Sequence, residues 1–559
     1  MDVFQKQIQA ASPSKKDAAK RSWIYVPYDR LTDRTGPLHE QQPQATGIVM
    51  MEALEKAHRR PYHKKKLALL ISNQRHFALE QAARGVKVIY MFTKGIFADG
   101  LLDAQKTFEL AEMTTMKPAE RELRLDLEEA RRRGVRLKIV EDTTWLSTEA
   151  DFDGVYAKET TSYVMDRFYR FLRKKREVLM ENGEPSGGRF SYDADNRKPY
   201  RGQPRVPTRP EFPPDEITRE VMMTVEREFP NHFGTLEGFD LPVTAEQCRH
   251  SWHFALQHLL PFFGPYEDAM ATAETDLFHS KISALLNLSR ILPGDVVDDV
   301  ENAYHAGLIP LASAEGFIRQ VLGWREFMRH VHRRTDGYRN IAAPRQKGQS
   351  VATDSYAGAT PSALDARLPL PAAYWGAKSG MNCLDTVIEQ VIREGWSHHI
   401  TRLMVLSNLA TLCGYSPREL ADWFWIAYID AYDWVVETNV LGMGTYGDGG
   451  VTATKPYVSG AAYIDRMSDY CKGCAFDPRK ASGEGSCPFT ALYWTFLERN
   501  SERLSGNIRL AMPYATLRKK SALERRQLRA RAEQAIQELG SARYPESAES
   551  NTEPESSGG

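Results

Sequence analysis

The pattern of secondary structure that the sequence predicts changes once along its length, and this change constrains the fold more than any other feature. Short β-rich runs alternate with helix-length segments up to about residue 157. From residues 215 to 539 helical periodicity dominates, with interruptions at turn-rich loops. Alternating strands and helices are typical of parallel βαβ units, whereas sustained helical periodicity indicates a helical domain. We therefore predict an N-terminal Rossmann-like α/β domain, a connector and a large all-α domain.

The boundaries follow from composition. A polar tail at residues 1–22 precedes the α/β domain at residues 23–157, and the connector at residues 158–214 ends in a stretch rich in Gly, Pro, Arg and Asp. The helical domain covers residues 215–539, and the polar residues 540–559 are expected to be disordered. The predicted strands are the β-rich runs at residues 23–26, 46–51, 66–71, 86–92, 137–140 and 153–157.

Composition also excludes several classes of protein. Lys plus Arg and Asp plus Glu both number 73, and 42% of the 559 residues are apolar, as in folded soluble proteins. The longest apolar run near the aromatic stretch, residues 423–429, is far shorter than the ~20 residues of a membrane-spanning helix. The first 21 residues lack the apolar stretch of a secretory signal. We therefore expect a cytoplasmic protein without membrane contact. Separately from composition, we expect a monomer.

Four of the six cysteines are candidates for one metal centre, namely Cys383, Cys471, Cys474 and Cys487. Two thiolates three residues apart can bind one centre, and the pair Cys487-Pro488 resembles the final ligand of many 4Fe-4S clusters. Four sulfur ligands fit a tetrahedral zinc ion or an iron-sulfur cluster, and spacing does not distinguish them. We interpret Cys248 and Cys413 as core thiols.

Three segments of the helical domain carry motifs of a known family. They are residues 276–283, residues 315–329 with Trp324-Arg325-Glu326-Phe327, and residues 397–402 followed by residues 423–450. They resemble the photolyase and cryptochrome family, whose flavin domain has a serine-containing phosphate clasp, an R-x-x-x-x-W-R-E-F helix and an Arg-Asp pair over FAD. With the four cysteines, the chain is similar to the iron-sulfur bacterial cryptochromes and photolyases, whose repair members are prokaryotic (6-4) photolyases.

The resemblance implies an antenna domain at the N-terminus, FAD in the helical domain and a 4Fe-4S cluster on the four cysteines. It implies FAD contacts from His279, Ser280, Ser283, Arg319, Arg402, Asp430, Asn439, Gly442 and Met443. Trp423, with Tyr463 near it, would carry electrons to the flavin.

The implied function is light-driven repair of (6-4) pyrimidine-pyrimidone photoproducts in UV-damaged DNA by an electron from photoexcited reduced FAD. The implied lesion pocket contains His398, His399, Leu403, Met443 and Tyr457. Adjacent residues of a helix lie about 100° apart, so only one of the two histidines can point into a given pocket, and we assign His399. A histidine suits proton transfer near neutral pH.

Two departures from the family keep an alternative function open. Family members usually have Gly-Asp-Gln-Leu after the first strand, and many bind 6,7-dimethyl-8-ribityllumazine there; this chain has Tyr28-Asp29-Arg30-Leu31. A Tyr side chain where a backbone should approach a ligand obstructs it, so we expect the lumazine to be absent or held differently. Val436 stands where repair members carry Glu, with Glu437 next to it. These departures favour a non-repairing blue-light photoreceptor with an unknown partner; an iron-sulfur DNA-binding protein is a third alternative.

Binding of DNA requires local basic patches, because the net charge is zero. The candidates are residues 167–176, 197–209, Lys455 and 518–531, and we favour residues 197–209. Asp193 and Asp195 are candidates for a magnesium site, although an exposed acidic loop explains them equally well.

Overall fold

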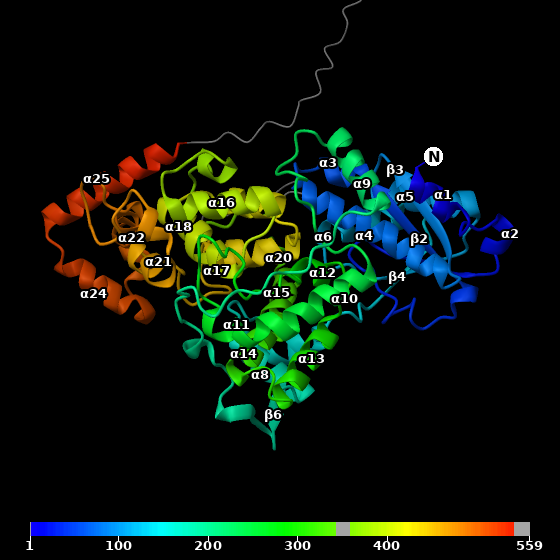
Figure 1. Cartoon of the computed structure of the whole chain (residues 1–559), viewed down its shortest axis with the longest axis horizontal. Helices are drawn as coiled ribbons and strands as arrows, with labels where there is room; N and C mark the ends of the chain where they lie inside the picture. The colour runs from blue at the N-terminus through cyan, green and yellow to red at the C-terminus, as the bar shows by residue number, and fades with distance from the viewer. Residues whose placement is uncertain (1, 342–357, 541–559) are drawn as a thin grey trace, which may run out of the picture.

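A computed structural model describes residues 2–341 and 358–540. The chain forms an α/β region and a larger helical region that extends from it in two directions (Figure 1). The expected disordered tail lies outside the described residues except for Gly540. In the described part of the chain, no helix is both long and apolar enough to cross a membrane.

The α/β region contains a five-stranded parallel sheet of order β3-β2-β1-β4-β5. The strand order reverses beside β1, as in Rossmann-like folds, so the predicted α/β class is confirmed. The elements of this region are β1 (Ser22–Tyr25), β2 (Thr46–Ala53), α3 (Leu54–His58), α4 (Lys64–Ala83), β3 (Lys87–Thr93), α5 (Phe97–Phe108), β4 (Met113–Met116), α6 (Arg121–Arg132), β5 (Leu137–Val140) and α7 (Glu149–Val155).

Two predicted strands are wrong. Residues 66–71 belong to α4, and residues 153–155 belong to α7. The apolar run in α4 is continuous because this helix is buried on nearly all sides, and a helix of that kind cannot be told from a buried strand by periodicity. The prediction also missed β4, which lies between β1 and β5.

The polar tail at residues 1–22 is folded over most of its length. It forms α1 (Val3–Gln9) and α2 (Lys15–Ala18), and Phe4 and Ile8, one helical turn apart, are buried. The carboxylate of Glu220 accepts hydrogen bonds from the first amides of α1. The connector also contains a helix, α8 (Met165–Arg176), which packs against residues 319–325.

The helical region carries the motif segments. Its principal helices are α9 (Glu216–Glu228), α10 (Ala245–Phe254), α11 (Leu260–Tyr266), α12 (Ser283–Asn287), α13 (Pro293–His305), α14 (Leu311–Ile318), α15 (Glu326–Thr335), α16 (Asn382–Glu394), α17 (His399–Thr401), α18 (Asn408–Cys413), α19 (Pro417–Ala427), α20 (Asp433–Val436), α21 (Ala461–Met467), α22 (Pro488–Arg499), α23 (Ser501–Leu504), α24 (Ala511–Lys519) and α25 (Ala522–Leu539). Four further segments among the described residues are π-helical, namely η4 (Ala255–Leu259), η5 (Arg319–Arg325), η8 (Arg402–Ser407) and η9 (Glu437–Gly444).

Candidate functional site

The three motif segments meet at a cavity of about 280 Å³ within the helical region, which we call the central cavity. Residues from α12, η5, α17 and the stretch around α20 form its walls. Seven of the residues predicted to bind the cofactor or the lesion line it: His279, Ser280, Ser283, His399, Arg402, Asp430 and Asn439. The fold therefore brings together positions that are up to 160 residues apart in sequence.

An Arg-Asp pair fixes one wall of the central cavity. Arg402 binds Asp430 through two hydrogen bonds of 3.0 and 2.9 Å, and its Nε donates to the carbonyl of Ser397 at 2.7 Å. The Ser283 hydroxyl donates to the Asp430 carboxylate at 2.6 Å, and Asn287 donates to the Asp430 carbonyl at 2.8 Å. Bidentate charged hydrogen bonds fix orientation as well as charge, so this wall is set before any ligand arrives.

The two adjacent histidines have different surroundings. His399 lines the central cavity, where desolvation by the surrounding walls and the charges of Arg402 and Arg319 lower its pKa to about 4. His398 does not line the cavity; its ring stacks on His279 with centroids 4.4 Å apart. His399 is therefore neutral at pH 7 in the ligand-free protein.

Other predicted lesion residues lie away from the cavity lining. Leu403 and Met443 are buried among apolar side chains of the core. Tyr457 is partly buried, and burial raises its pKa against the opposing charges of Arg509 and Arg197. Their contact with a lesion stays a prediction.

Three predicted FAD residues also lie away from the cavity lining. Arg319 lies behind the wall, where it approaches Asp193 (3.1 Å), Glu315 (3.5 Å) and Glu267 (3.8 Å). Gly442 packs closely against a buried cluster: a Cβ at this position would lie 2.1 Å from the Thr452 hydroxyl oxygen. Met443 follows it in the same π-helical segment and does not line the cavity.

Several lining residues were missed by the sequence analysis, namely Glu267, Gln320, Trp396, Trp434 and Val435. Val435 lines the cavity, and Val436, which stands where repair members carry Glu, does not. Glu437 is sequestered in a buried network, where it accepts hydrogen bonds of 2.8 Å from His332 and Arg418 that lower its pKa to about 2. Trp396 stands directly before the Ser397-His398 motif, which is the signal that could have found it.

Trp423 is fully buried in a group of aromatic rings. Its ring contacts Tyr374 at 5.2 Å and Tyr428 at 5.9 Å, and the guanidinium of Arg402 lies 4.1 Å from the Tyr428 ring. A path of contacts thus leads from Trp423 to the cavity wall. In the described residues no ring contact joins Tyr463 to Trp423; the Tyr463 hydroxyl donates to Asp268 at 3.4 Å.

The four predicted metal-binding cysteines face one small cavity between α16, α21 and the start of α22. Burial and the three other thiols raise the pKa of Cys383, which places the four sulfurs within electrostatic range of each other. The other lining residues are Met381, Ala461, Ile464, Tyr470, Phe476 and Phe489. Over residues 2–341 and 358–540, no three His, Cys, Asp or Glu side chains are close enough to hold a single metal ion.

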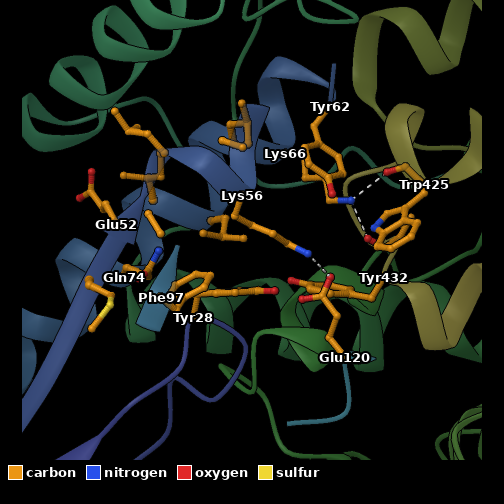
Figure 2. A pocket seen from close by; sticks show the side chains of 18 residues that line it. Tyr28, Glu52, Lys56, Tyr62, Lys66, Gln74, Phe97, Glu120, Trp425 and Tyr432 are labelled. Carbon is orange, nitrogen blue, oxygen red and sulfur yellow. Dashed lines mark hydrogen bonds and ion pairs between the residues drawn. The ribbon is translucent and has the colours of Figure 1, made fainter. Parts of the chain in front are cut away.

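A second pocket lies between the α/β region and the helical region, and we call it the interdomain pocket (Figure 2). Tyr28, Phe97, Tyr62, Trp425 and Tyr432 supply aromatic walls. Lys66 Nζ donates to the carbonyls of Trp425 (2.9 Å) and Ala431 (2.6 Å), and Lys56 Nζ pairs with Glu120 at 2.9 Å. Burial lowers the pKa of Lys66 far below its ordinary value, and burial beside Asp433 and Glu122 raises that of Glu120.

The polar groups of the interdomain pocket are not all satisfied. Tyr28 Oη, Gln74 Oε1 and Glu120 Oε2 are buried without a hydrogen-bond partner in the part of the chain that the structure describes. Buried polar atoms are normally paired, so these three atoms can take a partner from outside the chain, such as water or a polar ligand.

Two family models and a curated relative match the chain. Residues 24–241 match the family "deoxyribodipyrimidine photo-lyase-related protein", and residues 317–468 match "FAD binding domain of DNA photolyase". The chain is 37% identical over 517 residues to a "(6-4) photolyase" from Agrobacterium fabrum (strain C58 / ATCC 33970), covering 91% of this chain and 98% of that protein.

Two solved structures share the fold. A cryptochrome from Synechocystis sp. PCC6803 superposes with a TM-score of 0.54 at 15% identity, covering 93% of this chain and 98% of the other. A class III photolyase from Agrobacterium tumefaciens has a TM-score of 0.52 at 14% identity, with 93% and 97% covered.

Proposed function

The chain belongs to the photolyase and cryptochrome family, and from this membership we propose that it repairs (6-4) photoproducts in DNA with light. The observation that carries the proposal is the 37% identity to a (6-4) photolyase over 98% of that protein. The central cavity supports it, because the histidine expected to move a proton and the Arg-Asp pair expected to hold the flavin line the same space.

The central cavity fits FAD. Trp396 Nε1 and Arg325 Nε are buried hydrogen-bond donors with no partner among the described residues, and both side chains line the cavity. Unpaired donors suit the carbonyls and phosphates of a flavin dinucleotide. We propose that Ser280 and Ser283 bind the phosphates, that Arg402 and Asp430 bind the flavin, and that Trp423 passes electrons toward it. Bound FAD supplies an electron to the lesion after absorbing light.

His399 is the proposed proton carrier. Its neutral imidazole can accept a proton from one pyrimidine and return it to the other, and its position on the cavity wall brings it to the lesion rather than to the core. Arg402 lowers its pKa, so the phosphates of bound DNA, which carry the opposite charge, raise it toward neutrality.

Repair by purified protein tests the proposal. We expect that FAD-loaded protein, reduced and illuminated, restores the pyrimidines in an oligonucleotide with a (6-4) lesion, measured by chromatography. His399→Ala should lose at least about 100-fold in rate and keep its FAD, whereas His253→Ala, at an exposed position on α10, should be unchanged. Complete FAD reduction without lesion loss in the unaltered protein would refute repair and favour the photoreceptor function.

A 4Fe-4S cluster fits the four-cysteine cavity better than zinc. A single zinc ion needs four sulfurs within about 2.3 Å of one point, whereas these thiols line a cavity and form no single-ion group in the described residues. We propose that Cys383, Cys471, Cys474 and Cys487 bind the cluster. Cys474→Ala should lose iron and acid-labile sulfide together with solubility, while Cys413→Ala, in the core of α18, should keep both. Zinc in the purified protein would contradict the cluster.

The interdomain pocket fits a planar heterocycle, and we propose that it is the antenna site. Tyr28 forms part of the aromatic wall, so a lumazine would be held by side chains such as Tyr28, Gln74 and Glu120 rather than by a glycine backbone. Mass spectrometry of chromophores released from the purified protein tests this. Magnesium does not fit at the acidic loop, because arginines pair with both Asp193 and Asp195.

A further inference from the structure

The backbone is left-handed at two positions in the segment of residues 276–283, which carries the serines proposed to bind phosphate. We call this segment the clasp. Leu277 and Lys281 have positive φ angles of 44° and 59°. Residues other than glycine seldom adopt this region, and for a bulky side chain such as Leu it is an outlier. Such conformations persist only where surrounding contacts fix them, so the contacts of the clasp determine its shape.

The carboxylate of Asp276 fixes the first residue of the clasp. It accepts a hydrogen bond of 2.8 Å from Lys281, further along the clasp, and one of 2.9 Å from Gln390 on α16. Lys281 Nζ also pairs with Glu394 of α16 at 2.9 Å. The clasp is therefore closed on itself by one ion pair and attached to α16 by two further contacts.

Arg209 holds the clasp from outside the central cavity. Its guanidinium donates hydrogen bonds to the carbonyl of His279 and, at 3.5 Å, to that of Ser280, and its Nε lies 3.4 Å from the Asp276 carboxylate. His279 and Ser280 line the cavity, whereas Arg209 does not. A guanidinium can bind several acceptors at once in a fixed arrangement. Arg209 thus binds the backbone of residues that line the cavity without lining it itself.

The connector presents Arg209 from a fixed position. Upstream, Tyr266 Oη on α11 donates to the carbonyl of Gln203 at 3.2 Å, and Tyr200 Oη donates to that of Pro204 at 2.9 Å. The side chain of Arg209 is only 24% exposed, and all three of its nitrogens contact the clasp. Although this residue ends the stretch favoured for DNA binding, its side chain faces the clasp instead.

We propose that Arg209 is a positioning residue for the flavin cofactor, which holds the carbonyls of His279 and Ser280 on the side away from the central cavity and so keeps the clasp ready for a diphosphate. This inference deepens the proposed function, because it takes FAD as the ligand. Phosphates bind to amide N–H and hydroxyl groups, and carbonyl oxygens turned toward them would oppose binding. A preformed clasp also loses no binding free energy to ordering of the loop.

The test compares FAD with riboflavin, which has the same ring system and no phosphate. In full-length flavin-free protein, Arg209→Met should raise the dissociation constant for FAD about tenfold, equivalent to about 1.4 kcal/mol. The dissociation constant for riboflavin should stay within about twofold, because riboflavin has no diphosphate for the clasp to bind. Quenching of flavin fluorescence measures both. Arg219→Met is the matched control, since Arg219 also donates to a backbone carbonyl, that of Pro214, but at an exposed position of α9.

Each other outcome has a definite meaning. Equal loss of affinity for FAD and riboflavin would show that Arg209 supports the whole cavity, and unchanged FAD affinity would show that the clasp does not depend on it; either result overturns the inference. If Arg209→Met does not fold, Arg209→Lys, which keeps one donor group, should still lower the ratio of FAD to riboflavin affinity about threefold, and an unchanged ratio would overturn the inference. Failure of the unaltered protein to bind any flavin would instead refute the proposed function.

Discussion

The central cavity and the interdomain pocket share one stretch of chain, yet they are prepared for ligands in different ways. Asp430, Trp434 and Val435 line the central cavity, whereas Ala431 and Tyr432 line the pocket. Within the described residues, Trp396 and Arg325 leave nitrogen donors unpaired in the central cavity. In the interdomain pocket, Gln74 leaves an amide oxygen unpaired and Glu120 leaves a carboxylate oxygen unpaired.

The shared wall is held from both sides. On the central-cavity side, Arg402 and Ser283 bind the Asp430 carboxylate. On the pocket side, Lys66 binds the carbonyls of Trp425 and Ala431 (Figure 2). The central-cavity side of the wall is thus held by paired charges, whereas the pocket side is held by hydrogen bonds to backbone carbonyls. The comparison implies that the two sites depend on each other through residues 425–435.

The largest expected effect follows from breaking the Arg-Asp pair. Arg402→Met leaves the Asp430 carboxylate, which is 5% exposed, without its charged partner. Breaking a buried pair costs about 3–5 kcal/mol, so we expect FAD affinity to fall at least about 100-fold. The ratio of flavin to protein after gel filtration measures it. Arg367→Met, in a pair with Asp365 on the surface, is the control and should retain FAD. Unchanged flavin content in Arg402→Met would show that the pair does not hold the cofactor.

Removing the amine on the other side of the wall should have the next largest effect. Lys66→Met leaves two buried carbonyls without their donor, at about 1–3 kcal/mol each. We expect a loss of about 2–6 kcal/mol in unfolding free energy by urea titration, together with weaker FAD binding. Lys378→Met, at an exposed lysine, should change neither. A loss of stability with normal FAD binding would show that the two sites are independent.

The sequence predicted the segments of the central cavity better than the side chains that line it. Residues 276–283, 315–329, 397–402 and 423–450 do meet there. However, η5, η8 and η9 are π-helical, and their wider turn shifts which residue faces inward. A period of 3.6 residues therefore does not apply in these segments. Gly442 and Met443 were expected to contact FAD by resemblance and not by periodicity, and neither lines this cavity; they lie in η9, whereas the lining residue Val435 lies in α20.

The interdomain pocket was beyond prediction for a different reason. Its lining comes from β2, α3, α4, α5 and the end of α19, so no local motif marks it. Tyr28 was expected to obstruct a ligand, but the position of its ring depends on tertiary contacts with Phe97 and Tyr432. The same limit applied to α4: its apolar run reflects burial between the sheet and the helical region, which sequence periodicity does not report.

The pH dependence of the unfolding free energy tests the charge state of one residue in the central cavity, Glu267. Burial raises the pKa of Glu267, which lines this cavity, from its ordinary 4.5 to about 8. The folded protein then binds a proton that the unfolded chain releases above pH 4.5, so this group's stabilising contribution is present below pH 4.5 and is lost as pH rises to about 8. The loss is at most about 1.4 kcal/mol per pH unit. Glu267→Gln should flatten the stability curve over this range; an unchanged slope would contradict the assigned pKa.

The smallest effect tests the unpaired atoms of the interdomain pocket. Tyr28→Phe removes a buried hydroxyl that has no partner in the described chain, so ligand-free protein should gain about 0.5–1 kcal/mol in unfolding free energy. Tyr25 is the matched control, because its hydroxyl is likewise buried and unpaired there but does not line the pocket. If the pocket binds a chromophore through Tyr28, only Tyr28→Phe should also lower the amount of chromophore that copurifies. Equal retention in both variants would leave the aromatic rings, and not the hydroxyl, as the basis of binding in the pocket.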